Sequence, residues 1–322
     1  MESTSFSGRD FLTLMDYTAE EIIAILDRAV DFRERLRRKE PHDMLRGRTA
    51  VALFEKPSTR TRVSFQVSCS HLGMHSYYMR PDEMQLSRGE PIKDTARVLD
   101  RYCDVLFIRT FGQEIVEEYA RYMSKPVINA LTNMTHPCQG LADLLTIRER
   151  KGAFKGLKLA YVGDVWNIAH TLMVCGAIFG MNVFVAHPRG YEPHERVLTF
   201  VNAKARETGA TIRLTEDIEE AACEADIVYA NVWHSMGGPE AWEGQRLHDF
   251  ANYQVDSRVF GLARQDAIFM HCLPSHRGQE VTDDVLEHPR SVIFEQAENR
   301  LHLQKALLAE MLGGLGTPAA YR

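Results

Sequence analysis

The segment Thr-Ala-Val-Ala-Leu-Phe-Glu-Lys-Pro-Ser-Thr-Arg-Thr-Arg (residues 49–62) decides the fold class. Its first part is a short apolar run, which is typical of a strand buried on both faces of a parallel sheet. Pro57 ends that run, and Ser58 is a residue type that caps the N-terminus of a helix. We therefore predict a strand over 49–55, followed by a helix that ends near Gly73.

The same alternation continues along the chain in both directions. Short runs rich in β-branched and aromatic residues are separated by longer segments with helical spacing. Strands are predicted over 49–55, 104–110, 126–131, 157–163, 182–186, 227–232 and 267–273. This pattern indicates an α/β fold of two doubly wound domains, each a mostly parallel sheet flanked by helices. A helix over 140–150 and the charged stretch 148–156 place the domain boundary near residue 150.

Length and composition agree with two globular domains. The 322 residues suit about two domains, and 45% hydrophobic with 25% charged residues excludes a disordered chain, a fibre or a disulfide miniprotein. Lys and Arg number 38 against 44 Asp and Glu, and the net charge of -6 does not favour nucleic acid or anionic membranes as partners. The six cysteines form no C-x-x-C pair, and no apolar stretch reaches membrane-helix length. We expect reduced thiols and a cytosolic location.

Open parallel sheets bind ligands at the carboxyl ends of their strands. After the strand over 49–55, the segment Ser58–Arg62 brings together the free N–H groups of a helix N-terminus, three hydroxyls and two guanidinium groups. The helix dipole also favours an anion there, so we predict a phosphate site. The alternative is a capped helix whose arginines make surface ion pairs. No Walker loop is present.

Further polar residues stand at the other strand ends. Arg109 ends the strand over 104–110, and His136 and Gln139 follow the strand over 126–131. Because they occur at consecutive strand ends of one domain, they indicate a shared polar ligand rather than isolated structural residues. In the second half the corresponding residues are Asp164, Asn167, Asn231, His271 and Cys272. Three roles remain open for Cys272: a nucleophile, a proton acceptor or a packing residue.

These segments resemble the signature segments of the carbamoyltransferase family. The resemblance rests on Phe54–Arg62, His136–Asp143, His271–Pro274 and Glu298–Arg300, in the family's order and spacing along almost the whole chain. Within the family, Ser235-Met236-Gly237 and His271-Cys272-Leu273-Pro274 are similar to the ornithine enzymes rather than to the aspartate enzymes.

The resemblance implies transfer of the carbamoyl group from carbamoyl phosphate to the side-chain amine of an amino acid. L-Ornithine would give L-citrulline and phosphate, with no metal or organic cofactor. Residues 1–150, with a C-terminal helix over about 300–322 that returns to them, would bind carbamoyl phosphate, and residues 151–299 would bind the acceptor. The resemblance also implies a homotrimer with shared sites, because Gln85 matches a position that reaches the phosphate held by a neighbouring subunit.

Roles for individual residues follow from the same resemblance. The phosphate would be held by Ser58, Thr59, Arg60 and Thr61, with Arg109 bridging phosphate and carbonyl oxygens. His136 and Gln139 would hold the carbamoyl group, and Arg300 with the backbone at Cys272 and Leu273 would complete its polarisation. The residues implied to contact the acceptor are Asn167, Asn231, Ser235 and Met236. The catalytic set would be Arg60, Arg109, His136, Cys272 and Arg300.

The sequence departs from the ornithine pattern at two positions. Asn231 stands where Asp is expected to face the acceptor's α-amino group, and Trp166 stands where Asn is expected. Asn231 lacks the negative charge, and a tryptophan would occupy volume in or behind the acceptor pocket. Another acceptor therefore stays open: 2,3-diaminopropionate, 2,4-diaminobutyrate, lysine or another ornithine analogue.

Two alternatives come from other classes of protein. A catalytically silent, metabolite-binding trimer would explain Asn231, although the complete phosphate loop argues against it. A nicotinamide dehydrogenase would share the fold, but the G-x-G-x-x-G turn that it needs is absent.

Overall fold

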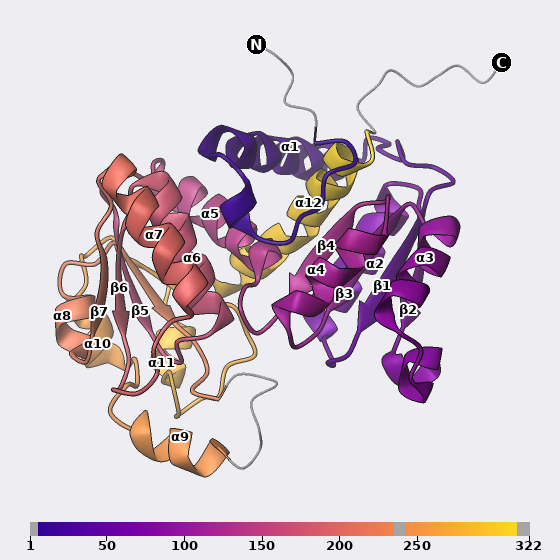
Figure 1. Ribbon diagram of the computed structural model, residues 1–322. Helices are drawn as coiled ribbons and strands as arrows, with labels where there is room; N and C mark the ends of the chain where they lie inside the picture. The colour runs from indigo at the N-terminus through magenta and orange to yellow at the C-terminus, as the bar shows by residue number, and fades with distance from the viewer. Residues whose placement is uncertain (1–5, 235–241, 314–322) are drawn as a thin grey trace. The chain divides into compact units, whose positions relative to one another are not determined.

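The computed structural model describes residues 6–234 and 242–313 (Figure 1). Its helices and strands are, in chain order, η1 (Leu14–Asp16), α1 (Ala19–Arg37), β1 (Thr49–Phe54), α2 (Thr59–His71), β2 (His75–Met79), η2 (Pro81–Glu83), η3 (Gln85–Arg88), α3 (Ile92–Tyr102), β3 (Val105–Arg109), α4 (Gln113–Tyr122), β4 (Val127–Leu131), α5 (Pro137–Lys151), β5 (Lys158–Val162), α6 (Asn167–Phe179), β6 (Asn182–Ala186), α7 (Glu195–Thr208), β7 (Ile212–Thr215), α8 (Ile218–Ala222), β8 (Ile227–Ala230), α9 (Glu243–Asp249), α10 (Ser257–Gly261), β9 (Ile268–His271), α11 (Asp283–Leu286) and α12 (Ile293–Met311). Within those ranges, no helix combines the length and apolarity needed to cross a membrane.

The chain divides into two compact units. The first holds the residues up to Leu141 together with those from Glu298 on, and the second is Ala142–Ala297. Both junctions fall inside helices, α5 and α12, whereas the sequence placed the boundary near residue 150. The α/β class is confirmed, and so is the return of the C-terminal helix to the first unit.

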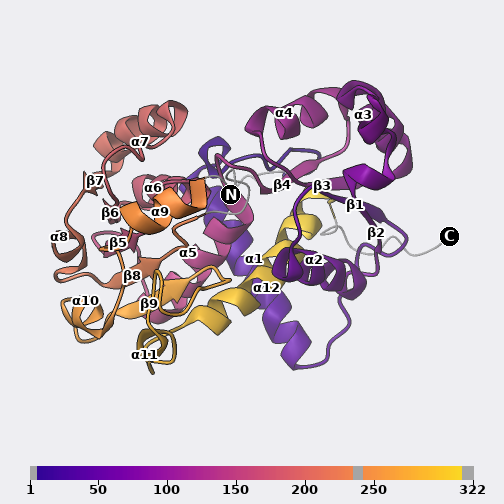
Figure 2. The same ribbon diagram turned by 90° about the horizontal axis from the view of Figure 1, so that it is seen from below.

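The sheet of the first unit has the strand order β2-β1-β3-β4, and all of its strands are parallel. On one face, Leu106 of β3 shares an apolar core with Leu99 of α3 and Val116 of α4. On the other face, the ring of Phe65 in α2 lies 3.6 Å from that of Phe107 in β3, measured between centroids. Figure 2 shows these helices on opposite faces of the sheet. Burial on both faces explains the continuous apolar runs of β1 and β3.

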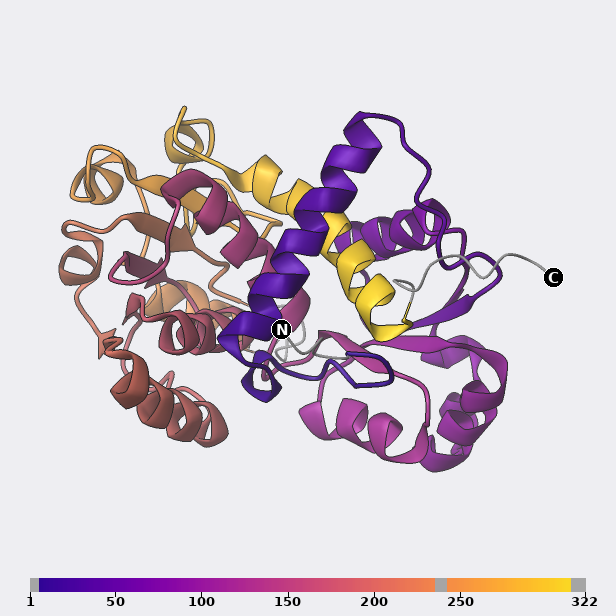
Figure 3. The ribbon, with the colours of Figure 1, turned by 90° about the horizontal axis from the view of Figure 1, so that it is seen from above.

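The two long helices of the first unit cross each other. Thr18 and Glu21 form a capping box at the start of α1, which satisfies N–H groups at that helix end. Lys305 Nζ of α12 donates to the backbone oxygen of Phe32 in α1 at 3.3 Å. Figure 3 shows the crossing of α1 and α12. Packing against α1 therefore holds the C-terminal helix in the first unit.

The sheet of the second unit has the order β7-β6-β5-β8-β9, again with parallel strands throughout. Helix α6, which follows β5, is buried from Asn167 to Ile178. The register pairs Tyr161 of β5 with Tyr229 of β8, and β8 pairs in turn with β9. The carboxyl ends of β5, β8 and β9 consequently lie next to one another.

Two strands, β2 and β7, were not predicted from the sequence. Both are edge strands, and their residues are mostly half-buried or exposed. The other strands were predicted: β6 has the predicted bounds, and the structure trims one or both ends of the rest by one or two residues.

Candidate active site

The N-terminus of α2 forms as the sequence predicts. Ser58 has extended backbone, and its Oγ accepts the N–H of Thr61 at 3.2 Å. No acidic residue occupies the first turn of the helix. The positive end of the helix dipole therefore faces no carboxylate of its own first turn, which suits an anion.

Arg300 joins residues that are far apart in the sequence. Its Nη2 donates to Thr61 Oγ1 at 2.6 Å, and its Nη1 donates to Gln139 Oε1 at 3.1 Å. All three side chains are buried. The first unit thus brings one predicted residue from each of α2, α5 and α12 into direct contact.

His136 lies beside the same group, just before α5. It is 3% exposed, and its backbone oxygen accepts the N–H of Gln139 at 3.0 Å. Burial, followed by the charges of Arg300, Arg109 and Arg60, holds the imidazole pKa well below its ordinary value of 6.5. His136 is therefore neutral near pH 7 and has one ring N–H to donate.

Arg109 is the last residue of β3 and is 3% exposed. Its charge also acts on Lys56, which is buried, donates to Asn133 Oδ1 at 2.8 Å and lies 4.0 Å from the centre of the Phe111 ring. Burial, with a further contribution from Arg109, lowers the pKa of Lys56 to about 8, while Glu55 acts in the opposite sense. Lys56 thus adds a cation to this edge of the sheet.

A cavity of about 460 Å³ opens at the start of α2. Ser58 and Thr59 line it together with Lys56, Arg62 and Arg80. The guanidinium of Arg62 lies over the ring of Tyr78, at 3.6 Å from the centroid. The lining thus carries three cations and several hydroxyl groups against one carboxylate, that of Glu55, and this balance suits a phosphate.

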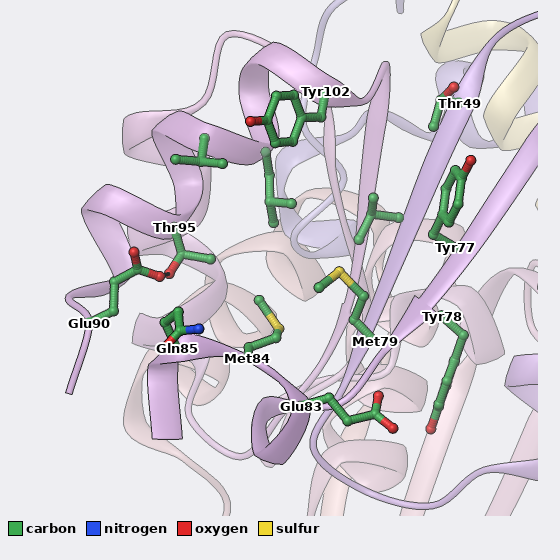
Figure 4. A pocket seen from close by; sticks show the side chains of 13 residues that line it. Thr49, Tyr77, Tyr78, Met79, Glu83, Met84, Gln85, Glu90, Thr95 and Tyr102 are labelled. Carbon is green, nitrogen blue, oxygen red and sulfur yellow. Dashed lines mark hydrogen bonds between the residues drawn. The ribbon is translucent and has the colours of Figure 1, made fainter. Parts of the chain in front are cut away.

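Gln85 lies elsewhere in the first unit, in η3. It lines a separate cavity of about 720 Å³ between β2 and α3, with Met84, Glu90 and Tyr102 around it (Figure 4). None of the other residues predicted to hold the phosphate lines that cavity. In this chain Gln85 therefore lines a different cavity from Ser58 and Thr59.

In the second unit, Asn231 follows β8 and Cys272 follows β9. Asn231 is 3% exposed, and its Nδ2 donates to the hydroxyl of Tyr161 at 3.1 Å. The thiol of Cys272 donates to Asn231 Oδ1 at 3.4 Å. Two predicted site residues from neighbouring strands are thus in contact.

The backbone after Cys272 is fixed by His271. Leu273, which has a positive φ of 58°, donates its N–H to His271 Nδ1 at 2.9 Å. Because Nδ1 accepts, the ring proton lies on Nε2, which is 3.4 Å from the fully buried carboxylate of Glu280. The Leu273 N–H, predicted to polarise the carbamoyl group, is engaged within the second unit.

Trp166 packs against an arginine of its own unit. The guanidinium of Arg246 in α9 pairs with buried Asp164 at 2.5 Å, and its carbon lies 5.5 Å from the centre of the Trp166 ring. Tyr191 approaches the same guanidinium at 4.9 Å. The tryptophan thus helps to cover a buried ion pair at the end of β5.

The remaining predicted acceptor residues divide into two groups. Asn167 is buried and begins α6 directly after Trp166. Ser235 and Met236 lie outside the described residues.

Sequence reasoning assigned no role to Lys56, Tyr161 or Arg246. Lys56 stands between a strand and a helix cap, so its position was a usable signal. Tyr161 is an aromatic residue within an apolar strand, and Arg246 is one charge on a short helix, so neither pattern indicated its contacts.

Two family models match the chain and together span most of it. "Aspartate/ornithine carbamoyltransferase, carbamoyl-P binding domain" matches residues 9–149, and "Aspartate/ornithine carbamoyltransferase, Asp/Orn binding domain" matches residues 155–311. The chain belongs to the aspartate/ornithine carbamoyltransferase family.

Individual members of the family are similar over nearly the full length. The anabolic ornithine carbamoyltransferase of Pyrococcus furiosus is 50% identical over 311 residues, which are 97% of this chain and 98% of that one. The ornithine carbamoyltransferase of Anoxybacillus flavithermus is 53% identical over 305 residues, 95% and 97% of the two chains. The solved structure of the Pyrococcus furiosus enzyme superposes with a TM-score of 0.92 at 49% identity, covering 97% of this chain and 99% of that one.

The protein is therefore a carbamoyltransferase. The family's two domains bind carbamoyl phosphate and the amino-acid substrate, respectively. In this carbamoyltransferase, the carbamoyl phosphate model covers Ser58–Thr61, Arg109, His136 and Gln139, whereas the second model covers Asn231 and Cys272. Arg300 falls within the second model by sequence but within the first unit by structure.

Proposed function

We propose that the protein transfers the carbamoyl group of carbamoyl phosphate to the side-chain amine of L-ornithine, giving L-citrulline and phosphate. The observation that carries the proposal is the junction in which Arg300 bonds Thr61 and Gln139 beside a neutral, buried His136. Cations and neutral donors of this kind suit a substrate with both a phosphate and a polar carbonyl.

The reaction follows from the charges that change. The unprotonated amine of the acceptor forms a bond to the carbamoyl carbon, the bond from that carbon to the phosphate oxygen breaks, and a proton of the amine leaves with phosphate. Negative charge grows on the carbonyl oxygen and on the leaving group. The ring N–H of His136, the guanidinium groups of Arg300 and Arg109, and Gln139 stabilise the first charge.

The leaving phosphate is held by the start of α2. Ser58, Thr59, Arg60 and Thr61 supply hydroxyl, guanidinium and N–H donors, and the helix dipole adds to them. This chemistry requires neither a metal nor an organic cofactor.

The acceptor is proposed to bind in the second unit through Asn167, Asn231, Ser235 and Met236, with Cys272 beside the attacking amine. Relatives about 50% identical over nearly the whole chain are named ornithine carbamoyltransferases, which favours ornithine over its analogues. The contact of Trp166 with Arg246 gives the tryptophan a structural role that needs no altered acceptor. No observation favours a catalytically silent protein.

We also propose a homotrimer in which Gln85 completes the phosphate site of a neighbouring subunit. The cavity around Gln85 has exposed apolar surface on its rim: Tyr77, Val98 and Tyr102 are 61%, 46% and 71% exposed. Strand β2 beside it is an edge strand. Exposed apolar surface at a sheet edge suits contact with a second copy of the chain. A cytosolic location stays a prediction from the sequence.

The acceptor is tested with a panel of amines. Carbamoyl phosphate and purified protein are combined with ornithine, lysine, 2,4-diaminobutyrate, 2,3-diaminopropionate, putrescine, N-acetylornithine or aspartate, and the ureido product is measured. We expect ornithine to have the highest kcat/KM, for the wild-type protein and for Asn231→Asp alike. Preference for another amine, moved toward ornithine by Asn231→Asp, would contradict the proposal, as would the absence of turnover.

A further inference from the structure

Tyr161 is a buried residue of β5 whose hydroxyl makes two hydrogen bonds in fixed directions. The side chain is fully buried, and its oxygen lies 2.6 Å from the backbone oxygen of Asp164. A carbonyl oxygen only accepts, so Tyr161 must donate its proton there. The hydroxyl lone pairs are left to accept from Asn231 Nδ2, at 3.1 Å.

This arrangement decides which way the Asn231 amide points. A terminal amide can be turned over to exchange its oxygen and nitrogen, and the hydrogen-bond network determines the orientation. With Nδ2 directed at Tyr161, Oδ1 is the atom that meets the thiol of Cys272, at 3.4 Å. The bonds form one directed chain across the ends of three neighbouring strands, from Cys272 to Asn231, to Tyr161, to the Asp164 carbonyl.

We propose that Tyr161 is a positioning residue, which makes Asn231 present its oxygen rather than its NH2 group to the α-amino group of the acceptor. The inference rests on the proposed function, which places the acceptor at Asn231. An amide oxygen has two lone pairs, so one remains for an N–H of the acceptor beside the Cys272 thiol. An NH2 group in the same place would oppose donor to donor.

The environment keeps Tyr161 in this role. Burial holds its pKa well above the ordinary value of 10, and the Asp164 charge acts in the same direction, whereas the bond from Asn231 lowers it. The hydroxyl therefore stays protonated and continues to donate to the Asp164 carbonyl.

The experiment is a double-mutant cycle between Tyr161→Phe and Asn231→Asp. Tyr161→Phe removes the hydrogen bond that orients the Asn231 amide. We expect the KM for ornithine to rise about tenfold, because the buried NH2 group of Asn231 can then face the α-amino group of ornithine. A carboxylate has an oxygen on both sides, so the same change in the Asn231→Asp background should raise the KM less than about twofold. The KM for carbamoyl phosphate should stay unchanged in all four proteins.

Tyr229→Phe is the matched control. Tyr229 pairs with Tyr161 in the register and is equally buried, but its hydroxyl bonds Gln296 and Asp143. We expect no change in the ornithine KM for Tyr229→Phe. An equal KM rise for Tyr161→Phe in both backgrounds, or no rise in either, would overturn the assignment.

Failure of the proposed function would be visible separately, because wild-type protein would then form no citrulline. The cycle would in that case be run with the amine that is turned over. Should Tyr161→Phe not fold, neutron diffraction from crystals of the unaltered protein places the hydrogens on the Asn231 amide directly. Hydrogens on the atom beside Cys272 would overturn the proposal, and hydrogens on the atom beside Tyr161 would support it.

Discussion

At the scale of single residues, Arg300 depends on the shape of its side chain, because it donates two hydrogen bonds in different directions. One guanidinium serves Thr61 and Gln139 together, and it does so while 4% exposed. A guanidinium presents several N–H donors in one plane, whereas an ammonium is a single point of charge. The proposed role in polarising the carbamoyl group therefore depends on the shape of this side chain as well as on its charge.

We expect Arg300→Lys to lower kcat for citrulline formation about 100-fold, because a donor aimed at the developing oxyanion is lost while a positive charge is kept. The KM for ornithine should change little. Steady-state kinetics with each substrate varied in turn measures both effects. Arg290→Lys is the control, since Arg290 also donates to two oxygens, those of Arg264 and Ala267, outside the proposed site. An unchanged kcat in Arg300→Lys would argue against the role.

The residues differ in how far the sequence reveals them. Ser58 through Arg62 are consecutive, so the Ser58 cap at the start of α2 could be predicted from a strand followed by a helix. The hydrogen bond that Asn231 donates to Tyr161 joins residues 70 positions apart and exists only because β5 and β8 pair in one register. A residue pattern does not contain that register, so the contact could not be predicted.

At the scale of elements, the start of α2 combines a stabilising role with the proposed binding of phosphate. Ser58 caps α2 by accepting the N–H of Thr61. Thr18 caps α1 in the same way, by accepting the N–H of Glu21. The two caps share their chemistry, but only the cap of α2 lies at the proposed phosphate site. Removing each cap in turn therefore distinguishes a loss of stability from a loss of phosphate binding.

Loss of either cap should cost about 1 kcal/mol of unfolding free energy, so Ser58→Ala and Thr18→Ala should shift urea denaturation alike. Only Ser58→Ala should also raise the KM for carbamoyl phosphate, about tenfold, because it removes a hydroxyl bond to an anion. Denaturation curves and initial rates on both variants measure this. Equal KM values for the two variants would show that Ser58 acts only as a cap.

Elements were predictable where burial is complete. β1, β3 and β8 are covered on both faces, so their apolar runs stand out. β2 and β7 are edge strands with polar residues such as His75 and Arg213, and a half-covered strand of that kind carries no continuous apolar run. The Ser58–Arg62 segment was predictable as the start of a helix because it follows one of the fully covered strands.

At the scale of the whole molecule, α12, the last helix among the described residues, completes the first unit. The junctions lie within α5 and α12, so no loop marks them. Because no loop marks the first junction, composition pointed instead to the nearby charged stretch 148–156 as the boundary. Because none marks the second, the return of α12 was expected only through the resemblance to the family. Arg300 reaches Thr61 because of that return.

The proposed trimer leads to a prediction about shared sites. Gln85 lines a different cavity from Ser58 and Thr59 in its own chain, and in the proposed trimer each phosphate site takes its Gln85 from a neighbour. We expect sedimentation equilibrium to give three times the chain mass, and Arg60→Ala and Gln85→Ala each to lose activity. Coexpressing the two inactive variants should restore about a quarter of full activity, since a site in a mixed ring is intact when its own Arg60 and its neighbour's Gln85 are both present. A site built from one chain would recover nothing on mixing, because every chain then carries one of the two lesions, and that result would contradict the shared site even if the mass were that of a trimer.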